Sequence, residues 1–407
     1  MHLLVIGSDR NLFKKNSDIW NRYSDYGKLF EEIHVIVFSH KDLGNKDAKI
    51  GENVFIYPTN HICKLFYLWN ICSISGQVIK NLKFKIKNYR DNIVVSSQDP
   101  FESGLAGWML KKIYKIPLQL QIHTDFLSPY FWQESFINKL RVIFAKFLIP
   151  RADGIRVVSE RIKQSLVKNF PIKLFCHSAL DAESRNLDSR FRGNDRGKIK
   201  NLKIDVLPIL IDVEAIKSAQ IKADLHKKYP QFDFIILMAS RLTKEKNIGL
   251  ALEAMAELVK KYPKLGLVIV GSGPERETLQ KLIVKSQLSN VVIEPFVAQD
   301  TLFSYYKTAD LYLLTSNYEG YGRSVMEAMA AGLPVVMSGV GLAGEVVEDG
   351  ENGVVFPVGD EKALVSAVEL LIKDNKRRNL FSLEGKKTLE NLITKEQYLK
   401  LYKESFN

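Results

Sequence analysis

The chain has 407 residues, too many for one ordinary hydrophobic core, so we expect two or three domains. Its hydrophobic fraction of 46% and charged fraction of 26% exclude disorder and collagen-like repeats and indicate a globular protein. The net charge of +12 arises in residues 1–200, which hold 32 Lys and Arg against 19 Asp and Glu. This asymmetry favours an anionic partner for the first half, although a solvated lysine-rich surface would also account for it.

The cysteines and the apolar runs indicate the compartment. The cysteine set is odd and sparse (Cys63, Cys72 and Cys176), which excludes a disulfide framework and a cysteine zinc site and fits a reducing cytosol. The opening apolar run, 2–6, is too short for the core of a signal peptide, and no run reaches the length of a spanning helix. We therefore expect a cytoplasmic protein, soluble or peripheral at the inner face of the cell membrane.

Short apolar, β-branched runs alternate with helical patterns along nearly the whole chain. The runs that predict strands are 2–6, 33–39, 93–97, 117–123 and 154–159 in the first half, and 234–240, 266–273, 291–296, 311–316 and 334–338 in the second. The stretches that predict helices include 102–115, 247–261, 275–287 and 322–331. Strands that are apolar throughout and separated by helices predict parallel sheets covered on both faces.

Two such sets of strands predict an α/β fold with two doubly wound, Rossmann-like domains, whose ligands bind at the carboxyl ends of the strands. The boundary is expected near 203–212, where a proline follows the last strand of the first set. The predicted domains are 1–205 and 206–393. A final amphipathic stretch, 394–407, is predicted to form a helix that packs back on the first domain.

Two helical stretches of the first half mix apolar and basic residues. In 135–149, one face is formed by the apolar residues at positions 136, 137, 140, 143, 144, 147 and 148. In 77–90, four aliphatic residues alternate with five basic ones. A core face with a solvated face opposite would explain these patterns, but basic amphipathic helices also bind anionic lipid. We predict association with an anionic membrane surface, and no nucleic-acid partner because no recognised nucleic-acid-binding module is present.

One segment, 176–197, interrupts the alternation. It is polar, has no period and is rich in Arg, Asp, Asn and Ser. It resembles the translated palindromic repeat elements that are inserted in some bacterial genes. We predict that it is an insertion forming a disordered surface loop, so that Asp181 and Glu183 within it are not a metal-binding motif.

The strongest chemical signal is the stretch TSNYEGYGRSVMEAMAAGLPVV at 315–336. Glu319 and Glu327 lie eight residues apart, and Gly320 and Gly322 form a turn after the first of them. A helix predicted to begin near Gly322 would present free amides and the positive end of its dipole to a phosphate. A carboxylate stabilising the helix N-terminus would explain either glutamate alone, but not both together with the two glycines.

These residues resemble the donor-binding region of retaining glycosyltransferases of family 4, which have the two-domain GT-B fold with the domains facing a central cleft. The resemblance continues through ASRLTKEKN at 239–247, VGSGPE at 270–275 and EVVEDGENGVVFPVGD at 345–360. It covers essentially all of 230–370. In the first half it is looser and rests on QIHTD at 121–125 and ADGIRVVSE at 152–160.

The resemblance implies a role for each matching side chain. Arg241 and Lys246 would neutralise the donor diphosphate, a task that cations can perform without a metal ion. Glu319 would contact the donor sugar and Glu327 the nucleotide ribose. His123, at a strand end in the first domain, would face the reacting carbon, although a lone histidine is more often structural.

Backbone positions would complete the donor site. The amides of Tyr321, Gly322 and Arg323 would meet phosphate or sugar oxygens. Gly271 and Gly273, which end a predicted strand, would let the donor approach the backbone closely.

Three departures from the family pattern concern its glycines and turns. Gly7 stands alone where many members have a glycine-rich loop, and Gly-Leu-Ala-Gly-Glu at 341–345 replaces Gly-Gly-x-Pro-Glu. Pro295-Phe296 replaces a Gly-Phe pair near the base.

The spacing G-x-G-x-x-G at 339–344 is not a dinucleotide fingerprint, because no long helix fits before the turn at Gly350.

The sequence therefore predicts an enzyme that moves a sugar from a nucleotide diphosphate donor, bound by the second domain, to a lipid-linked or polysaccharide acceptor, bound by the first. We expect no cofactor and no metal ion. Two alternatives remain: a catalytically inactive nucleotide-sugar-binding protein, and another GT-B nucleotide-sugar enzyme such as an epimerase.

Overall fold

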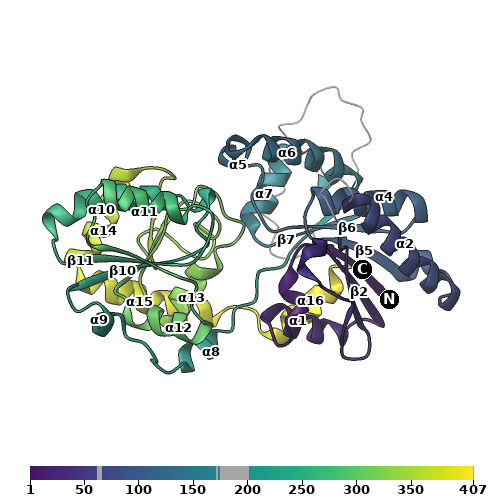
Figure 1. Ribbon diagram of the computed structural model, residues 1–407, viewed down its shortest axis with the longest axis horizontal. Coiled ribbons are helices and arrows are strands. Elements are labelled where there is room, and N and C mark those ends of the chain that lie inside the picture. Colours follow the sequence, from purple (N-terminus) through teal and green to yellow (C-terminus); the bar gives the residue numbers. More distant parts are fainter. Residues whose placement is uncertain (62–66, 171–172, 175–200, 407) are drawn as a thin grey trace. The chain divides into compact units, whose positions relative to one another are not determined.

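The computed structural model describes residues 1–61, 67–170, 173–174 and 201–406 (Figure 1). The predicted insertion at 176–197 lies outside the described residues. The chain forms two compact units. Unit 1 comprises Met1–His123, Phe136–Pro208 and Lys395–Asn407, and unit 2 comprises Thr124–Ser135 and Ile209–Thr394.

Unit 1 is built on a nine-stranded sheet with the order β3-β4-β2-β1-β5-β6-β7-β9-β8 among the described residues. Its strands are β1 (His2–Gly7), β2 (Glu32–Val37), β3 (Ala48–Ile50), β4 (Val54–Pro58), β5 (Ile93–Ser97), β6 (Leu118–Ile122), β7 (Gly154–Val157), β8 (Lys173–Leu174) and β9 (Asn201–Val206). The predicted strands β1, β2, β5, β6 and β7 pair parallel, as expected, whereas β3, which was not predicted, pairs antiparallel with β4 at one edge. The two strands are joined by a short turn, which permits an antiparallel hairpin but no crossover helix.

Helices cover both faces of this sheet. They are α1 (Asp18–Gly27), α2 (Tyr67–Lys85), α3 (Tyr89–Asn92), α4 (Glu102–Tyr114), α6 (Phe136–Leu148), α7 (Glu160–Asn169) and α16 (Lys395–Glu404). In Figure 1, α2, α4 and α6 lie on one face of the sheet, and α1 and α16 lie on the other. No described helix is both long and apolar enough to cross a membrane.

The C-terminal helix α16 joins unit 1 through aromatic contacts. The ring of Tyr402 stacks on Tyr26 of α1 at 3.9 Å between centroids, and the Tyr26 and Tyr398 hydroxyls are hydrogen-bonded at 2.9 Å. Both tyrosines of α16 are buried. Burial of such large rings ties the end of the chain to the first unit.

Unit 2 is built on a parallel sheet with the order β12-β11-β10-β13-β14-β15. Its strands are β10 (Phe234–Ala239), β11 (Leu265–Val270), β12 (Val291–Glu294), β13 (Leu311–Leu314), β14 (Val335–Ser338) and β15 (Val354–Phe356). Its helices are α5 (Pro129–Glu134), α8 (Val213–Ser218), α9 (Leu225–Lys228), α10 (Ile248–Lys261), α11 (Arg276–Lys285), α12 (Gln299–Thr308), α13 (Arg323–Ala331), α14 (Glu361–Lys373) and α15 (Asn375–Glu390). Figure 1 shows α10, α11 and α14 on one face of the sheet and α12, α13 and α15 on the other. Two doubly wound α/β units were predicted, and this prediction is confirmed.

A short segment, 124–135, packs in a unit other than the expected one. The sequence prediction gave it to the first domain, but its helix α5 belongs to unit 2. The Phe131 ring meets Tyr318 edge-on at 5.4 Å between centroids, and the Tyr318 hydroxyl donates to the Glu134 carboxylate. These side-chain contacts place the segment in unit 2, although its neighbours along the chain belong to unit 1. No local sequence pattern indicates them.

Side-chain caps begin several of the long helices. Ser17 before α1 and Ser159 before α7 accept hydrogen bonds from their own first turns. Asp360 before α14 and Asp374 before α15 do the same at 2.9 Å. Such caps satisfy amides that would otherwise lack a partner in the helix. Helix α13 differs, because it begins at Gly322 and has no side-chain cap.

Candidate active site

Two loops at the carboxyl end of the unit 2 sheet, one after β10 and one after β13, are tied directly to each other. The Thr315 hydroxyl donates to the Lys246 carbonyl at 2.9 Å, and the Asn317 amide donates to the Glu245 carbonyl at 2.8 Å. The Asn247 side chain donates to the Asn317 side chain at 3.1 Å. The loops that carry Lys246 and Glu319 are thereby held in one arrangement.

Lys246 and Glu319 form an ion pair in this arrangement. The Lys246 ammonium donates to Glu319 Oε1, and both side chains are only 13% exposed. The buried Ser316 hydroxyl donates to the same oxygen at 2.9 Å. Each charge is therefore compensated before any ligand is bound, which reduces the cost of keeping both of them out of water.

Arg241 lies on the same loop but in a different environment. Its side chain is 75% exposed and pairs with Glu245 at 3.0 Å. The sequence predicts that Arg241 and Lys246 act as a pair on one diphosphate. In the structure each of them pairs with its own carboxylate, and the Lys246 side chain is much less exposed than that of Arg241.

Glu327 lies in the second turn of α13 and is buried. The Tyr306 hydroxyl of α12 donates to one carboxylate oxygen at 3.1 Å, and Arg323 Nε donates to the other at 2.7 Å. Burial, together with neighbouring Tyr312 and Glu327, raises the pKa of Tyr306 well above its ordinary value, so its hydroxyl remains a donor. The carboxylate is thus held in one orientation, with lone pairs left for further donors such as ribose hydroxyls.

The N-terminus of α13 is shaped by glycine. Gly322 has φ of 97° and ψ of 50°, a left-handed conformation that residues with a Cβ rarely adopt. The predicted helix start near Gly322 matches the structure. The positive end of the α13 dipole therefore lies a few residues after Glu319, where it favours an anionic ligand.

Gly271 and Gly273, in the loop after β11, have a packing role within the protein itself. A Cβ at Gly271 would lie 1.9 Å from the carbonyl oxygen of Ser240, and one at Gly273 would lie 2.2 Å from that of Leu242. The Leu242 amide also donates to the Ser272 carbonyl at 2.9 Å. Both glycines therefore let the loop after β11 run directly against the loop that carries Arg241 and Lys246.

The altered turn at 341–345 supports the loop after β13. A Cβ at Gly341 would lie 2.5 Å from the Tyr321 carbonyl oxygen, and the Leu342 amide donates to that oxygen at 3.1 Å. Tyr321 itself is buried. No helix begins within this turn, which agrees with rejection of the G-x-G-x-x-G spacing as a dinucleotide fingerprint.

In unit 1, His123 directly follows β6. His123 Nε2 and the Gln121 side-chain oxygen are 3.1 Å apart, and Arg156 donates to the same oxygen. Because arginine can only donate, the Gln121 oxygen must face both groups, and His123 Nε2 must carry the proton. The Gln121 amide nitrogen in turn donates to Ser96 at 2.7 Å, which fixes the arrangement.

The electrostatic environment keeps this imidazole neutral. The protein atoms around it, followed by the positive charges of Arg156 and Arg22, lower the pKa of His123 below its ordinary value. The proton sits on Nε2, so Nδ1 is the basic nitrogen. This ring can accept a hydrogen bond from a hydroxyl at neutral pH, but it adds no charge.

The structure thus brings Arg241, Lys246, Glu319 and Glu327 together with the predicted backbone positions on adjacent loops of unit 2, whereas His123 belongs to unit 1. Sequence reasoning missed Tyr306 and Ser316. Ser316 stands inside the motif at 315–336 and could have been singled out there. Tyr306 gave no signal, because only the packing of α12 on α13 brings it to Glu327.

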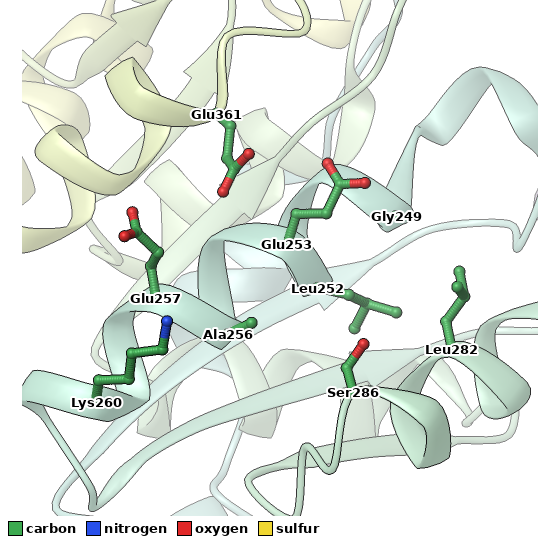
Figure 2. Close-up of a pocket in the computed structure, with 9 residues that line it drawn as sticks. All are labelled: Gly249, Leu252, Glu253, Ala256, Glu257, Lys260, Leu282, Ser286 and Glu361. Atoms are coloured by element: carbon green, nitrogen blue, oxygen red, sulfur yellow. The ribbon is translucent and has the colours of Figure 1, made fainter.

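A surface pocket elsewhere in unit 2 does not coincide with this site (Figure 2). It lies on α10 and α11 and is lined by Gly249, Leu252, Glu253, Ala256, Glu257, Lys260, Leu282, Ser286 and Glu361. Figure 2 shows three carboxylates, those of Glu253, Glu257 and Glu361, on one side of it. Such a group would repel a diphosphate, and the pocket contains no predicted site residue.

Two family models match the chain. Residues 222–388 match the model described as glycosyl transferases group 1, and residues 31–174 match the model described as glycosyltransferase family 4. The first match contains the charged loops of unit 2, and the second contains His123. Both models describe glycosyltransferase domains.

Curated relatives have the same class of name. Alpha-monoglucosyldiacylglycerol synthase of Acholeplasma laidlawii is 28% identical over 275 residues, which is 66% of this chain and 64% of that protein. An uncharacterized glycosyltransferase of Methanocaldococcus jannaschii is 23% identical over 387 residues, which is 92% of this chain and 90% of that one. Alpha-D-kanosaminyltransferase of Streptomyces kanamyceticus is 32% identical over 159 residues, 39% of this chain and 41% of that protein. The match thus spans less than two thirds of the first and third of these relatives.

Solved structures agree over the full length. Sucrose-phosphate synthase from Thermosynechococcus elongatus aligns with a TM-score of 0.75 at 17% identity, covering 100% of this chain and 99% of that one. HepE from Anabaena in complex with UDP-glucose aligns with a TM-score of 0.69 at 19% identity, covering 100% and 98%. At such identities the likeness establishes the fold, which is GT-B. The chain thus has the GT-B fold and contains two regions that match glycosyltransferase domain models.

Proposed function

We propose that this chain is a retaining, metal-independent glycosyltransferase that moves a sugar from a nucleotide diphosphate donor to a lipid-linked or saccharide acceptor of the cell envelope. The observation that carries the proposal is the edge of the unit 2 sheet. There a buried carboxylate, Glu327, lies on the helix whose N-terminus follows Glu319, and Glu319 is bonded to Lys246. This combination suits a ligand that has hydroxyls next to an anionic group.

Binding of the donor would replace contacts that the site residues now make with each other. Glu327 would accept from the ribose hydroxyls while Tyr306 and Arg323 fix its orientation. Lys246 would turn from Glu319 to the diphosphate, joined by Arg241 and by the N-terminus of α13. Glu319, released from Lys246, would accept from hydroxyls of the sugar. Structures of the neighbour HepE in complexes with UDP and with UDP-glucose support a uridine nucleotide as the first donor to test.

In the transfer step, the bond between the anomeric carbon and the diphosphate oxygen breaks, and the acceptor oxygen bonds to the same face of that carbon. The acceptor hydroxyl proton leaves with the diphosphate, whose developing charge the cations and the α13 dipole stabilise. We assign the neutral His123 imidazole to the hydroxyls of the reacting sugar, since it can accept from them without adding charge.

The proposal of an acceptor in the cell envelope is supported by the names of two relatives. The relative from Acholeplasma laidlawii is named for a glucosyldiacylglycerol, and a Staphylococcus aureus relative, 24% identical over 230 residues, is named for capsular polysaccharide biosynthesis. The basic excess of residues 1–200 suits an acceptor or a surface that carries anionic groups.

The test is incubation of the purified protein with UDP-sugars in the absence of an acceptor. We expect slow release of UDP together with a sugar of unchanged anomeric configuration, measured by chromatography and NMR. A catalytically inactive binding protein would be stabilised by UDP but release none, and an epimerase would return an altered sugar. Absence of thermal stabilisation by any nucleoside diphosphate or its sugars would refute the donor site itself.

A further inference from the structure

Helix α6 of unit 1 is apolar on two opposite faces. Its inner face, with Val142, Ala145 and Leu148, is buried. The opposite face consists of side chains that remain open to solvent: Phe136 (72% exposed), Ile137 (57%), Leu140 (40%), Ile143 (53%), Phe144 (39%) and Phe147 (39%). The hypothesis that this apolar stripe is a core face is therefore wrong for all of its residues except Leu148.

The exposed residues form one continuous stripe along the helix. Their spacing follows the helical repeat, and from Phe136 to Phe147 the stripe runs about 17 Å. A solvent-exposed apolar face of this extent marks an interaction surface, because a soluble protein rarely leaves so many large side chains together in water.

Basic side chains flank the stripe on both sides. Lys139 and Lys146 are exposed along one border, and neither forms an ion pair within the described residues. Arg141 lies along the other border, where it pairs with Glu102 at 2.9 Å. Arg151 lies over the Phe147 ring at 3.8 Å. An apolar stripe bordered by cations is the pattern of a helix that lies in the headgroup region of an anionic bilayer.

We propose that α6 docks unit 1 on an anionic lipid surface, with the stripe from Phe136 to Phe147 inserted among the acyl chains and Lys139 and Lys146 at the headgroups. The purpose of this docking rests on the proposed function: it would bring unit 1 to an acceptor held in a membrane. A second copy of this chain is the less suitable occupant, because stripe-to-stripe packing would bring the lysines of both copies together.

The other basic helix, α2, is a weaker candidate. The sequence pointed as much to the lysines at positions 80, 83 and 85 of α2, and to Lys87 just after it, as to α6. Lys83 lies over the Tyr89 ring at 4.4 Å, and Lys85 pairs with Glu32 at 3.6 Å. Trp69 and Phe84 of α2 are exposed but do not continue into a stripe like that of α6.

The test is flotation of the full chain with vesicles of phosphatidylcholine containing phosphatidylglycerol. The variant Ile137→Gln/Ile143→Gln/Phe144→Gln removes three exposed apolar side chains and should lower the partition coefficient by about tenfold or more. Its matched control, Val284→Gln/Leu380→Gln/Leu383→Gln, removes three exposed apolar side chains from unit 2 and should bind as the wild type does. Melting temperatures of both variants check that the chain remains folded.

Two further arms separate the contributions and the alternatives. The variant Lys139→Gln/Lys146→Gln should lose affinity for anionic vesicles but not the residual affinity for pure phosphatidylcholine. Equal vesicle binding by the α6 triple variant and the wild type would overturn the proposal. It would also be overturned if the wild type forms a dimer and does not bind vesicles, and if the triple substitution makes this dimer dissociate. UDP binding and UDP release, measured without vesicles on the same preparations, test the proposed function separately.

Discussion

The carboxyl ends of the two sheets present contrasting surfaces. In unit 2 the opposite charges are already paired, Lys246 with Glu319 between two loops and Arg323 with Glu327 on α13. In unit 1 the corresponding strand end of β6 carries a neutral imidazole and an amide, His123 and Gln121, held by Ser96 and Arg156. The first surface suits an anionic ligand, and the second suits an uncharged one.

The contrast indicates how a site for an anionic ligand can be built from paired charges. Paired charges remain stable without ligand because each compensates the other, and they become available when a diphosphate competes for the cation. The hydrogen bonds that hold His123 and Gln121 need no such exchange, and this arrangement can be rigid from the start. The following predictions test this difference.

The largest effect is expected at the partly buried ion pair of Lys246 and Glu319. Replacing Lys246 by Met should lower the turnover number by about 10²–10³-fold, because a cation that stabilises the leaving diphosphate is lost. It should also destabilise the fold by about 1–3 kcal/mol, since the partly buried Glu319 is left without its cation. Adding Glu319→Gln should restore the melting temperature but not turnover. Recovery of turnover in the double variant would contradict the role of Lys246.

The next effect concerns the contact between the loops after β10 and β11. Gly273→Ala places a methyl group against the Leu242 backbone and should lower stability by about 1–3 kcal/mol, measured by chemical denaturation. Gly249→Ala is the matched control, because a Cβ at that position meets no atom within 4 Å. The control should be neutral or stabilise by up to about 1 kcal/mol. Equal effects of the two substitutions would show that the loops are not tightly packed.

A smaller effect is expected on the imidazole of unit 1. The pKa of His123 lies below its ordinary value, so the unfolded chain takes up this proton more readily than the folded one. The stabilisation linked to the neutral ring is present above the ordinary pKa of about 6.5 and is lost as the pH falls toward the lower folded value. Arg22→Gln should raise the pKa of His123, and the separate variant Arg156→Met should raise it by more. The pKa in each variant is measured by NMR titration of the His123 ring. A fall in pKa in either variant would reverse the assignment.

The smallest effect is expected from chelation. Because Lys246, Arg241 and the α13 N-terminus are proposed to stabilise the diphosphate, turnover should remain within experimental error in excess EDTA. Loss of turnover that magnesium or manganese restores would contradict this account.

The contrast between the units also shows what the sequence could predict. Five strands of each sheet were recognisable because each is an apolar, β-branched run between helical patterns, and β5 coincides with its prediction at Ile93–Ser97. The hairpin of β3 and β4 escaped notice, because short edge strands give a weak signal. The helix start at Gly322 was predictable from the glycines and the motif around them.

Tertiary packing decided the rest. Only the packing of α12 brings Tyr306 to Glu327, only the β10 and β13 loops together pair Lys246 with Glu319, and neither contact has a local pattern. The amphipathic stripe of α6 was visible in the sequence, but its periodicity could not tell whether the stripe faces the core or the solvent. The contacts of α5 with Tyr318 were equally out of reach.

The central claim is that the edge of the unit 2 sheet binds a nucleotide diphosphate sugar through Glu327. Calorimetric titration of UDP and UDP-sugars into the wild type and Glu327→Ala tests it most directly, with Glu390→Ala, an exposed carboxylate of α15, as the control. We expect the wild type and the control to bind alike, and Glu327→Ala to bind at least about tenfold more weakly while remaining folded, since a hydrogen-bonded charged group contributes about 1.5–3 kcal/mol. Unchanged affinity in folded Glu327→Ala would contradict the assignment of this edge as the donor site.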